Sequence, residues 1–173
     1  MPSAFPHITF PAWMRTAGVA SVGIILDISG SVPLDEIKQV MVAIADLPSP
    51  SISGIALTDV AVQHAGSKEE ILQLILSSKI FGGGTDFSKI ADDAWKKIGC
   101  PPYLALISDG ETVNWPARFP VPTTLFMIER TGPHGNSPQS RGYNTPACSA
   151  TTNVQEILTL DLPRLQDLSR GLD

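Results

Sequence analysis

Cysteine is scarce in this sequence, with only Cys100 and Cys148 among 173 residues. A chain of this length can bury a substantial core without covalent cross-links. We therefore interpret the two cysteines as reduced thiols rather than as a disulfide. Reduced thiols are typical of a reducing compartment, so the expected location is cytoplasmic.

Basic residues and long apolar runs are also few. The chain has 12 Lys and Arg against 17 Asp and Glu, a net charge of −5. Because a general nucleic-acid-binding protein needs a basic face, nucleic acid is not an expected partner. The apolar run Ala17–Leu26 is shorter than the ~20 residues that cross a bilayer. We interpret it as a strand rather than as a signal peptide, and we expect no membrane partner.

Several catalytic signatures are missing. The histidines His7, His64 and His134 are scattered and form no His-Glu-x-x-His zinc motif. The Gly82–Lys89 segment lacks the Gly-Lys-Ser/Thr ending of a phosphate-binding loop. No Gly-x-Ser-x-Gly elbow occurs around Ser29. These absences argue against zinc hydrolysis, P-loop phosphoryl transfer and serine-type acyl transfer, and we expect a protein that is not an enzyme.

Hydrophobic periodicity predicts alternating strands and helices. Continuous apolar runs indicate buried strands, and apolar residues at helical spacing indicate helices that bury one face. Two helix starts have specific signals, namely Pro33 and the capping-box spacing of Ser67 and Glu70. The predicted strands are 20–27, 52–59, 60–65, 103–108 and 123–128, and the predicted helices are 33–45, 67–76 and 87–98.

This element order predicts an α/β fold. The short link between strands 52–59 and 60–65 indicates an antiparallel hairpin that places the second strand at an edge. Strands that alternate with amphipathic helices indicate a parallel sheet covered on both faces. The expected fold class is a Rossmann-like, doubly wound, mainly parallel sheet with one antiparallel edge strand.

We expect one domain over residues 1–173. Residues 1–16 are interpreted as an irregular arm, and 129–152 as a long loop because they are rich in Gly, Pro, Asn, Ser and Thr. The C-terminal segment 153–173 is harder to assign. Within it, 154–160 suits a strand or a helix, and 163–172 is predicted as a short helix.

Oxygen-bearing side chains stand in three segments where the predicted framework turns. Asp27, Ser29 and Ser31 follow the first strand at spacing i, i+2, i+4. Thr85 follows a glycine run ahead of a helix, and Asp109 follows another apolar strand. The carboxyl ends of parallel strands form the crevice where open α/β sheets bind ligands. Hard oxygen donors suit Mg²⁺, Mn²⁺ or Ca²⁺, so these five residues are predicted to bind a divalent cation.

This ordered set resembles the metal-ion-dependent adhesion site of the von Willebrand factor type A (VWA) family, whose pattern is D-x-S-x-S, a distant T and a distant D. The runs Gly-Gly-Gly-Thr-Asp-Phe and Ser-Asp-Gly-Glu are most similar to a bacterial VWA-like branch. The resemblance covers roughly residues 18–129. It implies that Ser29 and Ser31 bind the ion directly, and that Thr85, Asp27 and Asp109 do so directly or through water.

Charge indicates how such a site would work. Asp27 and Asp109 neutralise a divalent cation, and the hydroxyls add only neutral oxygens. Because Mg²⁺ retains waters in such sites, one water can be exchanged for a carboxylate from outside. We therefore expect a protein partner that supplies an Asp or Glu. The resemblance implies, for intracellular members, an adaptor role beside AAA+ ATPases of the MoxR or chelatase kind.

Other interpretations of these residues stay open. One is an Mg²⁺-dependent, phosphohydrolase-like enzyme that uses Asp27 and Asp109, and another is a secreted or surface adhesin. Each segment taken alone also suits an ordinary turn or helix cap. Three further acidic residues at the same rim are expected either to hold waters of the metal or to be solvated loop and cap residues: Asp59, Asp86 and Glu111.

Overall fold

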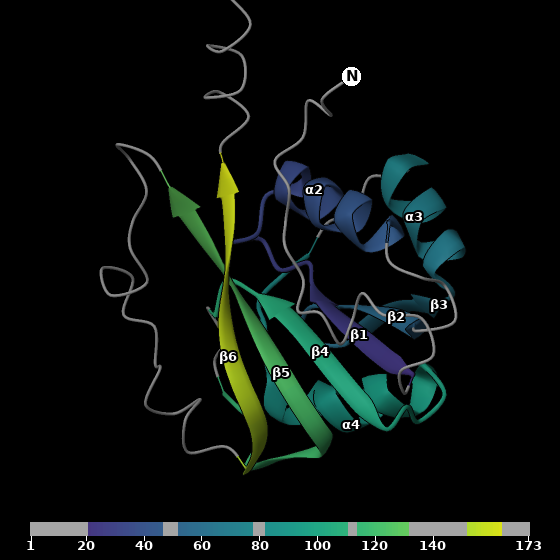
Figure 1. Cartoon of the computed structure of the whole chain (residues 1–173), viewed down its shortest axis with the longest axis vertical. Coiled ribbons are helices and arrows are strands. Elements are labelled where there is room, and N and C mark those ends of the chain that lie inside the picture. The colour runs from purple at the N-terminus through teal and green to yellow at the C-terminus, as the bar shows by residue number, and fades with distance from the viewer. Residues whose placement is uncertain (1–20, 47–51, 78–81, 111–113, 132–151, 164–173) are drawn as a thin grey trace, which may run out of the picture.

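A six-stranded sheet runs through the middle of the molecule (Figure 1). The computed structural model describes residues 21–46, 52–77, 82–110, 114–131 and 152–163. The strand order is β3-β2-β1-β4-β5-β6, and only β3 is antiparallel to its neighbour. The strands are β1 (Val22–Asp27), β2 (Ile52–Thr58), β3 (Val62–Gly66), β4 (Tyr103–Ser108), β5 (Arg118–Thr131) and β6 (Thr152–Pro163).

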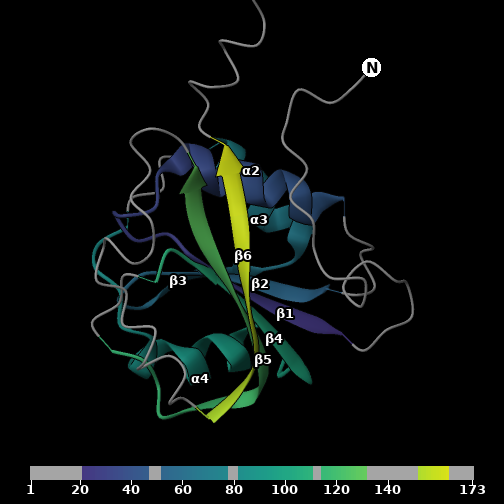
Figure 2. The same cartoon turned by 60° about the vertical axis from the view of Figure 1, so that its left-hand side comes forward.

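Helices cover both faces of this sheet, as two views show (Figure 1, Figure 2). The helices α2 (Leu34–Ala45) and α3 (Lys68–Ser77) lie on one face, and α4 (Phe87–Lys97) lies on the other. The predicted fold class is therefore confirmed: a mainly parallel, Rossmann-like α/β sheet with one antiparallel edge strand.

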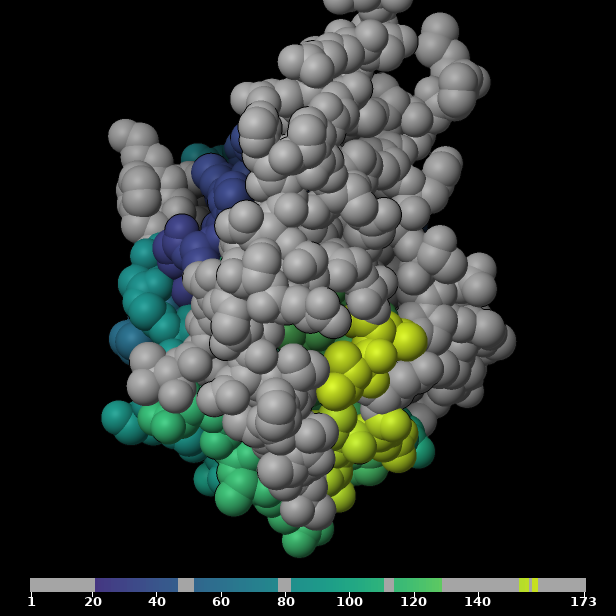
Figure 3. All heavy atoms as spheres, turned by 90° about the vertical axis from the view of Figure 1, so that its left-hand side faces the viewer, coloured from purple at the N-terminus to yellow at the C-terminus, as the bar shows by residue number. Residues whose placement is uncertain are grey.

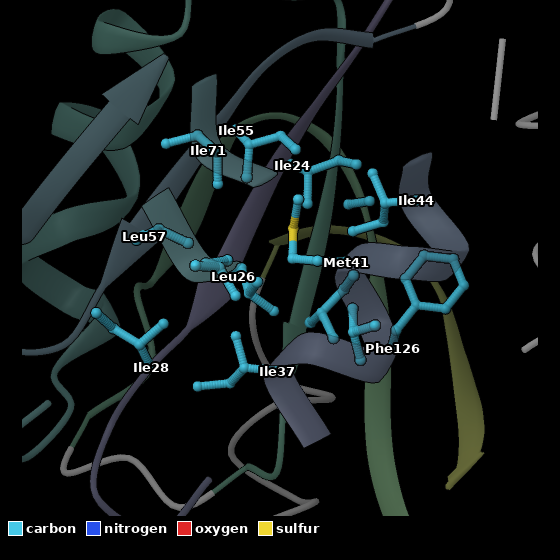
Figure 4. Close-up of a cluster of buried hydrophobic side chains, with 14 of the residues drawn as sticks. Ile24, Leu26, Ile28, Ile37, Met41, Ile44, Ile55, Leu57, Ile71 and Phe126 are labelled. Carbon is cyan, nitrogen blue, oxygen red and sulfur yellow. The ribbon is translucent and has the colours of Figure 1, made fainter. Parts of the chain in front are cut away.

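Alternate residues of the central strands fill two separate apolar clusters. In β1, Ile24 and Leu26 pack toward α2 and α3, and Ile25 packs toward α4. Figure 4 shows the first cluster, in which Met41 of α2 lies among side chains of the strands. Because both faces of β1 are buried, its sequence is a continuous apolar run without polar alternation.

Local signals in the sequence explain where the helices begin. Pro33 precedes the first turn of α2 with a φ of −60°. At α3 the capping box forms, because the Glu70 amide donates to Ser67 Oγ (3.2 Å) and the Ser67 amide donates to Glu70 Oε2 (2.8 Å). Asp86 caps α4 by accepting a hydrogen bond from the Ser88 amide at 3.1 Å. The prediction that Asp86 is a cap residue is confirmed.

The chain reverses its winding direction between β1 and β4. After β1 it crosses through α2 to β2 on one side, and α4 later leads to β4 on the other side of β1. This arrangement creates a topological switch point at the carboxyl ends of β1 and β4. Open α/β sheets bind ligands at such a point.

Two C-terminal strands differ from the prediction. β5 begins at Arg118 rather than at Thr123, and the pairing with β6 shifts register between these two residues. Pro120 and Pro122 lie within the shift, where the absence of an N–H group breaks no regular ladder. The sequence did not predict this first part of β5, because proline normally indicates that a segment is not a strand.

The predicted bounds of the loop at 129–152 are wrong at both ends, where the residues belong to strands. Residues 129–131 continue β5 and pair with 161–163 of β6, so the ambiguous segment 154–160 is a strand. Pro163, predicted as the first residue of a helix, is instead the last described residue of this strand. The predictions for 1–16, 132–151 and 164–172 lie outside the described residues.

The sheet has two different edges. β3 closes one edge, and β6 closes the other, where part of it reaches the molecular surface (Figure 3). In β6, Ile157 is 41% exposed. None of the helices in the described part of the chain has the length and apolar character of a membrane span. Cys100 is an exposed free thiol, and Cys148 lies outside the described residues.

Candidate metal centre

Asp27 is the centre of a polar cluster at the end of β1. Its side chain is fully buried, with 0% of its surface exposed. Oδ1 accepts hydrogen bonds from the Ser29 amide (2.8 Å) and from Thr85 Oγ1 (3.3 Å). Oδ2 accepts one from Ser108 Oγ (2.6 Å). Three segments that are far apart in the sequence therefore meet on one carboxylate.

Strand geometry explains why these side chains converge. Leu26 packs toward α2 and α3, so the next residue, Asp27, faces α4. Leu106 packs toward α4, and Ser108 two residues later faces the same way. Thr85 immediately precedes the Asp86 cap of α4, so it also reaches Asp27 from this side.

A close approach of two loops brings Thr85 to Asp27. The Gly30 amide donates to the Gly83 carbonyl at 2.9 Å. A Cβ atom built on Gly82 would lie 1.7 Å from the Ile28 carbonyl oxygen and 2.9 Å from Ser29 Cα. No side chain fits there without displacement of backbone, so the loop requires glycine at position 82.

Asp59 holds the same glycine loop from the β2 side. Its Oδ2 accepts a hydrogen bond from the Gly83 amide (3.1 Å), and its Oδ1 accepts from Gln63 Nε2 (2.8 Å) and the Ala61 amide (3.1 Å). Burial raises the pKa of Asp59, but these hydrogen bonds together outweigh burial and leave the pKa below its usual value. With 6% exposure it is a buried positioning residue, and the alternative of a solvated loop residue is wrong.

The other predicted ligands also lie in this region. Ser29 and Thr85 are each 2% exposed and Asp109 is 1% exposed, whereas Ser31 is partly exposed. Ser29 Oγ and Ser31 Oγ are 3.1 Å apart and share a hydrogen bond. Asp109 directly follows Ser108, and its charge contributes to the electrostatics of Asp27. All five residues are thus at the carboxyl edge of β1 and β4 or in the loops beside it.

The electrostatics of Asp27 are unfavourable for its charge. Burial raises the pKa of Asp27 from 3.8 to about 6, and the neighbouring charge of Asp109 adds to this increase. Hydrogen bonds from Ser108 and Ser29 oppose the increase but do not cancel it. At neutral pH the carboxylate is therefore held in the fold against a desolvation penalty.

The donor set fits a hard divalent cation. Within the described ranges no group of three or more His, Cys, Asp or Glu side chains lies close enough to hold a metal. A metal here would thus combine two carboxylates with hydroxyl oxygens, a donor set that suits Mg²⁺ and not Zn²⁺. A cation would also offset the desolvation that raises the pKa of Asp27.

The simpler turn and cap interpretations account for part of the geometry. The bond from the Ser29 amide to Asp27 is a local Asx-type contact, and Asp86 caps α4. They do not account for the bonds that reach Asp27 from Thr85 and Ser108, which are 58 and 81 residues away in the chain. Glu111 lies outside the described residues.

No protein-family model matches the chain, and no curated protein matches it.

Sequence reasoning missed two residues of this cluster: Ser108 and Thr58, whose Cα pairs with Asp27. It placed Asp59 at the rim but did not predict its bond to the glycine loop. Ser108 was assigned only as the last residue of a strand. The signal that could have found it is the period of two along 104–108, which puts Ser108 on the face of Leu104 and Leu106. The bond between Asp59 and Gly83 carries no comparable signal, because the two residues are 24 positions apart in the chain.

Proposed function

We propose that this chain is a VWA-like, metal-ion-dependent protein-binding module. In this proposal Asp27, Ser29, Ser31, Thr85 and Asp109 hold Mg²⁺, with Mn²⁺ or Ca²⁺ as the other candidate ions. The supporting observation is the buried Asp27 carboxylate, on which hydroxyls from two distant segments converge and whose charge lacks full compensation. Burying a carboxylate in this way destabilises a fold unless a cation offsets it.

Two carboxylates balance a divalent cation, and neutral hydroxyls complete only part of its shell. The ion would then keep exchangeable waters and supply a Lewis-acidic position for an outside oxygen. Three exposed glycines, Gly30, Gly83 and Gly84, lie beside this cluster. Because they carry no side chain, they leave room for an Asp or Glu of a partner.

The partner class follows from the VWA resemblance. We propose an intracellular adaptor role beside an AAA+ ATPase of the MoxR kind, in the cytoplasm. The acidic net charge of −5 suits a cation-bridged protein contact better than nucleic-acid binding.

Titration calorimetry with Mg²⁺ and Mn²⁺ tests the ion site. Wild-type protein is expected to bind one ion, and Asp27→Asn is expected to lose binding without loss of folding, because Asn keeps the shape of the side chain. Asp92→Asn, an exposed change on α4, is the matched control and should bind as wild type does. Equal binding by wild type and Asp27→Asn would remove Asp27 from the site.

Affinity capture from the native cell tests the partner. Immobilised wild-type protein is expected to retain an AAA+ ATPase in Mg²⁺ and release it with chelator, and Asp27→Asn should retain none. The Asp and Glu residues of the captured protein are then replaced one at a time, and one of these replacements should abolish retention. Retention that survives chelation would contradict a metal bridge.

One observation favours a second function, an Mg²⁺-dependent hydrolase. A buried carboxyl with a pKa of about 6 is suited to proton transfer near neutral pH. Assays with generic phosphate esters test this alternative. Mg²⁺-dependent turnover that disappears in Asp27→Asn and persists in Asp92→Asn would replace the binding proposal.

A further inference from the structure

One buried hydroxyl group beside Asp27 takes part in none of the hydrogen bonds described above. Thr58, the last residue of β2, is 0% exposed, and its Cα is paired with Asp27 of β1. Among the described residues, Thr58 Oγ1 has no hydrogen-bond partner. A buried hydroxyl without a partner destabilises the fold, so this atom calls for an explanation.

The side chain of Thr58 faces the candidate metal centre. Leu57 packs toward α2 and α3, so Thr58 faces α4, as Asp27 and Ser108 do. These three residues form a row across β2, β1 and β4. Ser108 donates to Asp27 from one side, whereas the Thr58 hydroxyl on the other side bonds to neither oxygen of Asp27.

Packing alone does not explain a threonine at this position. Valine has the same shape, prefers strands and has no polar atom to satisfy. Another buried threonine of the sheet behaves differently, because Thr123 is also 0% exposed but donates to the Val121 carbonyl at 2.9 Å. A Thr58 hydroxyl that has no partner in the described part of the chain thus fits a ligand that is not part of the protein.

We propose that Thr58 is a positioning residue of the metal centre, whose hydroxyl binds a water molecule in the coordination shell of the ion. This inference rests on the proposed function. Mg²⁺ retains several waters, and the groups that hold such waters fix the geometry of the site. Thr58 would hold one water on the β2 side, where none of the five predicted ligands stands.

Isosteric variants separate this role from a structural one. Thr58→Val, Thr58→Ser and Thr123→Val are compared by Mg²⁺ calorimetry and by urea unfolding in metal-free buffer. Thr58→Val is expected to raise the Mg²⁺ dissociation constant about tenfold or more, the usual size of a lost outer-shell contact. Its metal-free unfolding midpoint should be equal to or above that of wild type, because an unsatisfied hydroxyl is removed.

The two other variants serve as controls. Thr58→Ser keeps the hydroxyl and should bind Mg²⁺ within about threefold of wild type, a change far below an outer-shell loss. Thr123→Val should lower the midpoint, because it removes a protein hydrogen bond, and should leave Mg²⁺ binding unchanged.

Two results would overturn the inference while the proposed function stands. One is Mg²⁺ binding by Thr58→Val that equals wild type while Asp27→Asn binds none. The other is a lowered metal-free midpoint in Thr58→Val, which would mean that the hydroxyl has a partner within the protein. If wild-type protein binds no Mg²⁺ at all, the proposed function itself fails and this inference fails with it.

Discussion

The two faces of the sheet end in opposite ways at the carboxyl edge of β1, β2 and β4. On one face the apolar core continues to the end of the strands, and on the other it gives way to buried polar groups. The last side chains toward α2 and α3 are Leu26, Leu57 and Ile107, and those toward α4 are Asp27, Thr58 and Ser108.

This difference places two kinds of buried side chain on adjacent residues of the same strands. Burial of the apolar side chains stabilises the fold in proportion to the area removed from water. The polar side chains are equally buried, but they are tolerated only through hydrogen bonds and charge compensation. Both faces carry an apolar core, but at this edge one face ends in apolar side chains and the other in a cluster of oxygens.

The largest expected effect is on the apolar side. Leu26→Ala should lower the free energy of unfolding by about 4 kcal/mol, as is usual for a fully buried leucine. The folded variant should bind Mg²⁺ as wild type does, because Leu26 faces away from the polar cluster. Urea unfolding and calorimetry measure the two quantities. A tenfold loss of Mg²⁺ affinity in the folded variant would show that the two faces are not separable.

Asp27→Asn should have the opposite pattern: it should lose Mg²⁺ binding and, in metal-free buffer near neutral pH, be more stable than wild type. Folding raises the pKa of Asp27 from 3.8 to about 6, so the folded state binds this proton more tightly than the unfolded state does. The resulting contribution to stability is full below pH 3.8 and is lost as the pH rises through about 6. This shift corresponds to on the order of 3 kcal/mol. Metal-free wild-type protein should lose most of this amount between pH 4 and pH 7 relative to Asp27→Asn.

Urea unfolding of both proteins over this pH range measures the difference between their unfolding free energies. The titration of all other groups cancels in this difference. Saturating Mg²⁺ at pH 7.5 should restore the stability of wild type and leave the variant unchanged. Parallel pH profiles for the two proteins would contradict a raised Asp27 pKa.

A methyl group at Gly82 should damage the polar side through the backbone. Its position 1.7 Å from the Ile28 carbonyl oxygen forces the two loops apart. Gly82→Ala should lower the unfolding free energy by about 2 kcal/mol, as overpacking does, and should abolish Mg²⁺ binding. Gly83→Ala is the control, because its Cβ would lie 3.8 Å from the nearest atom, Asp59 Oδ2. Equal Mg²⁺ affinity for the two variants would contradict the role of the close approach.

The smallest effect is expected at Asp59, which holds the glycine loop from outside. Asp59→Asn exchanges an acceptor for a donor opposite the Gly83 amide and should lower stability by about 1.5 kcal/mol, the value of one charged hydrogen bond. Amide hydrogen exchange should increase at Gly83 and Gly30 and remain unchanged in the central strands. Unchanged protection at Gly83 would show that Asp59 does not position this loop.

The comparison of the two faces also explains what the sequence could predict. The apolar runs and helical spacings were sufficient for β1, β4, α2 and α4, because each pattern is local. The positions of Asp27, Thr85 and Asp109 at strand ends and before a helix were equally local. Their convergence followed from the rule that parallel strands present their carboxyl ends at one edge.

Interactions that depend on register could not be predicted in this way. The pairing of Asp27 with Thr58 and the bond from Ser108 to Asp27 depend on how neighbouring strands align, which no single segment encodes. The same limit applies to the contact of Gly82 with Ile28, which requires the two loops in three dimensions. Sequence patterns thus located the predicted ligands but not the residues that hold them.

Cys100 offers a practical use of this architecture. It is exposed at the amino end of β4, whereas Asp27 and Ser108 stand at the carboxyl end of the sheet. A strand of six residues separates the two ends by about 20 Å. In a Cys148→Ser background, a maleimide tether on Cys100 would fix the molecule to a biosensor chip with its oxygen cluster turned toward the flowing sample.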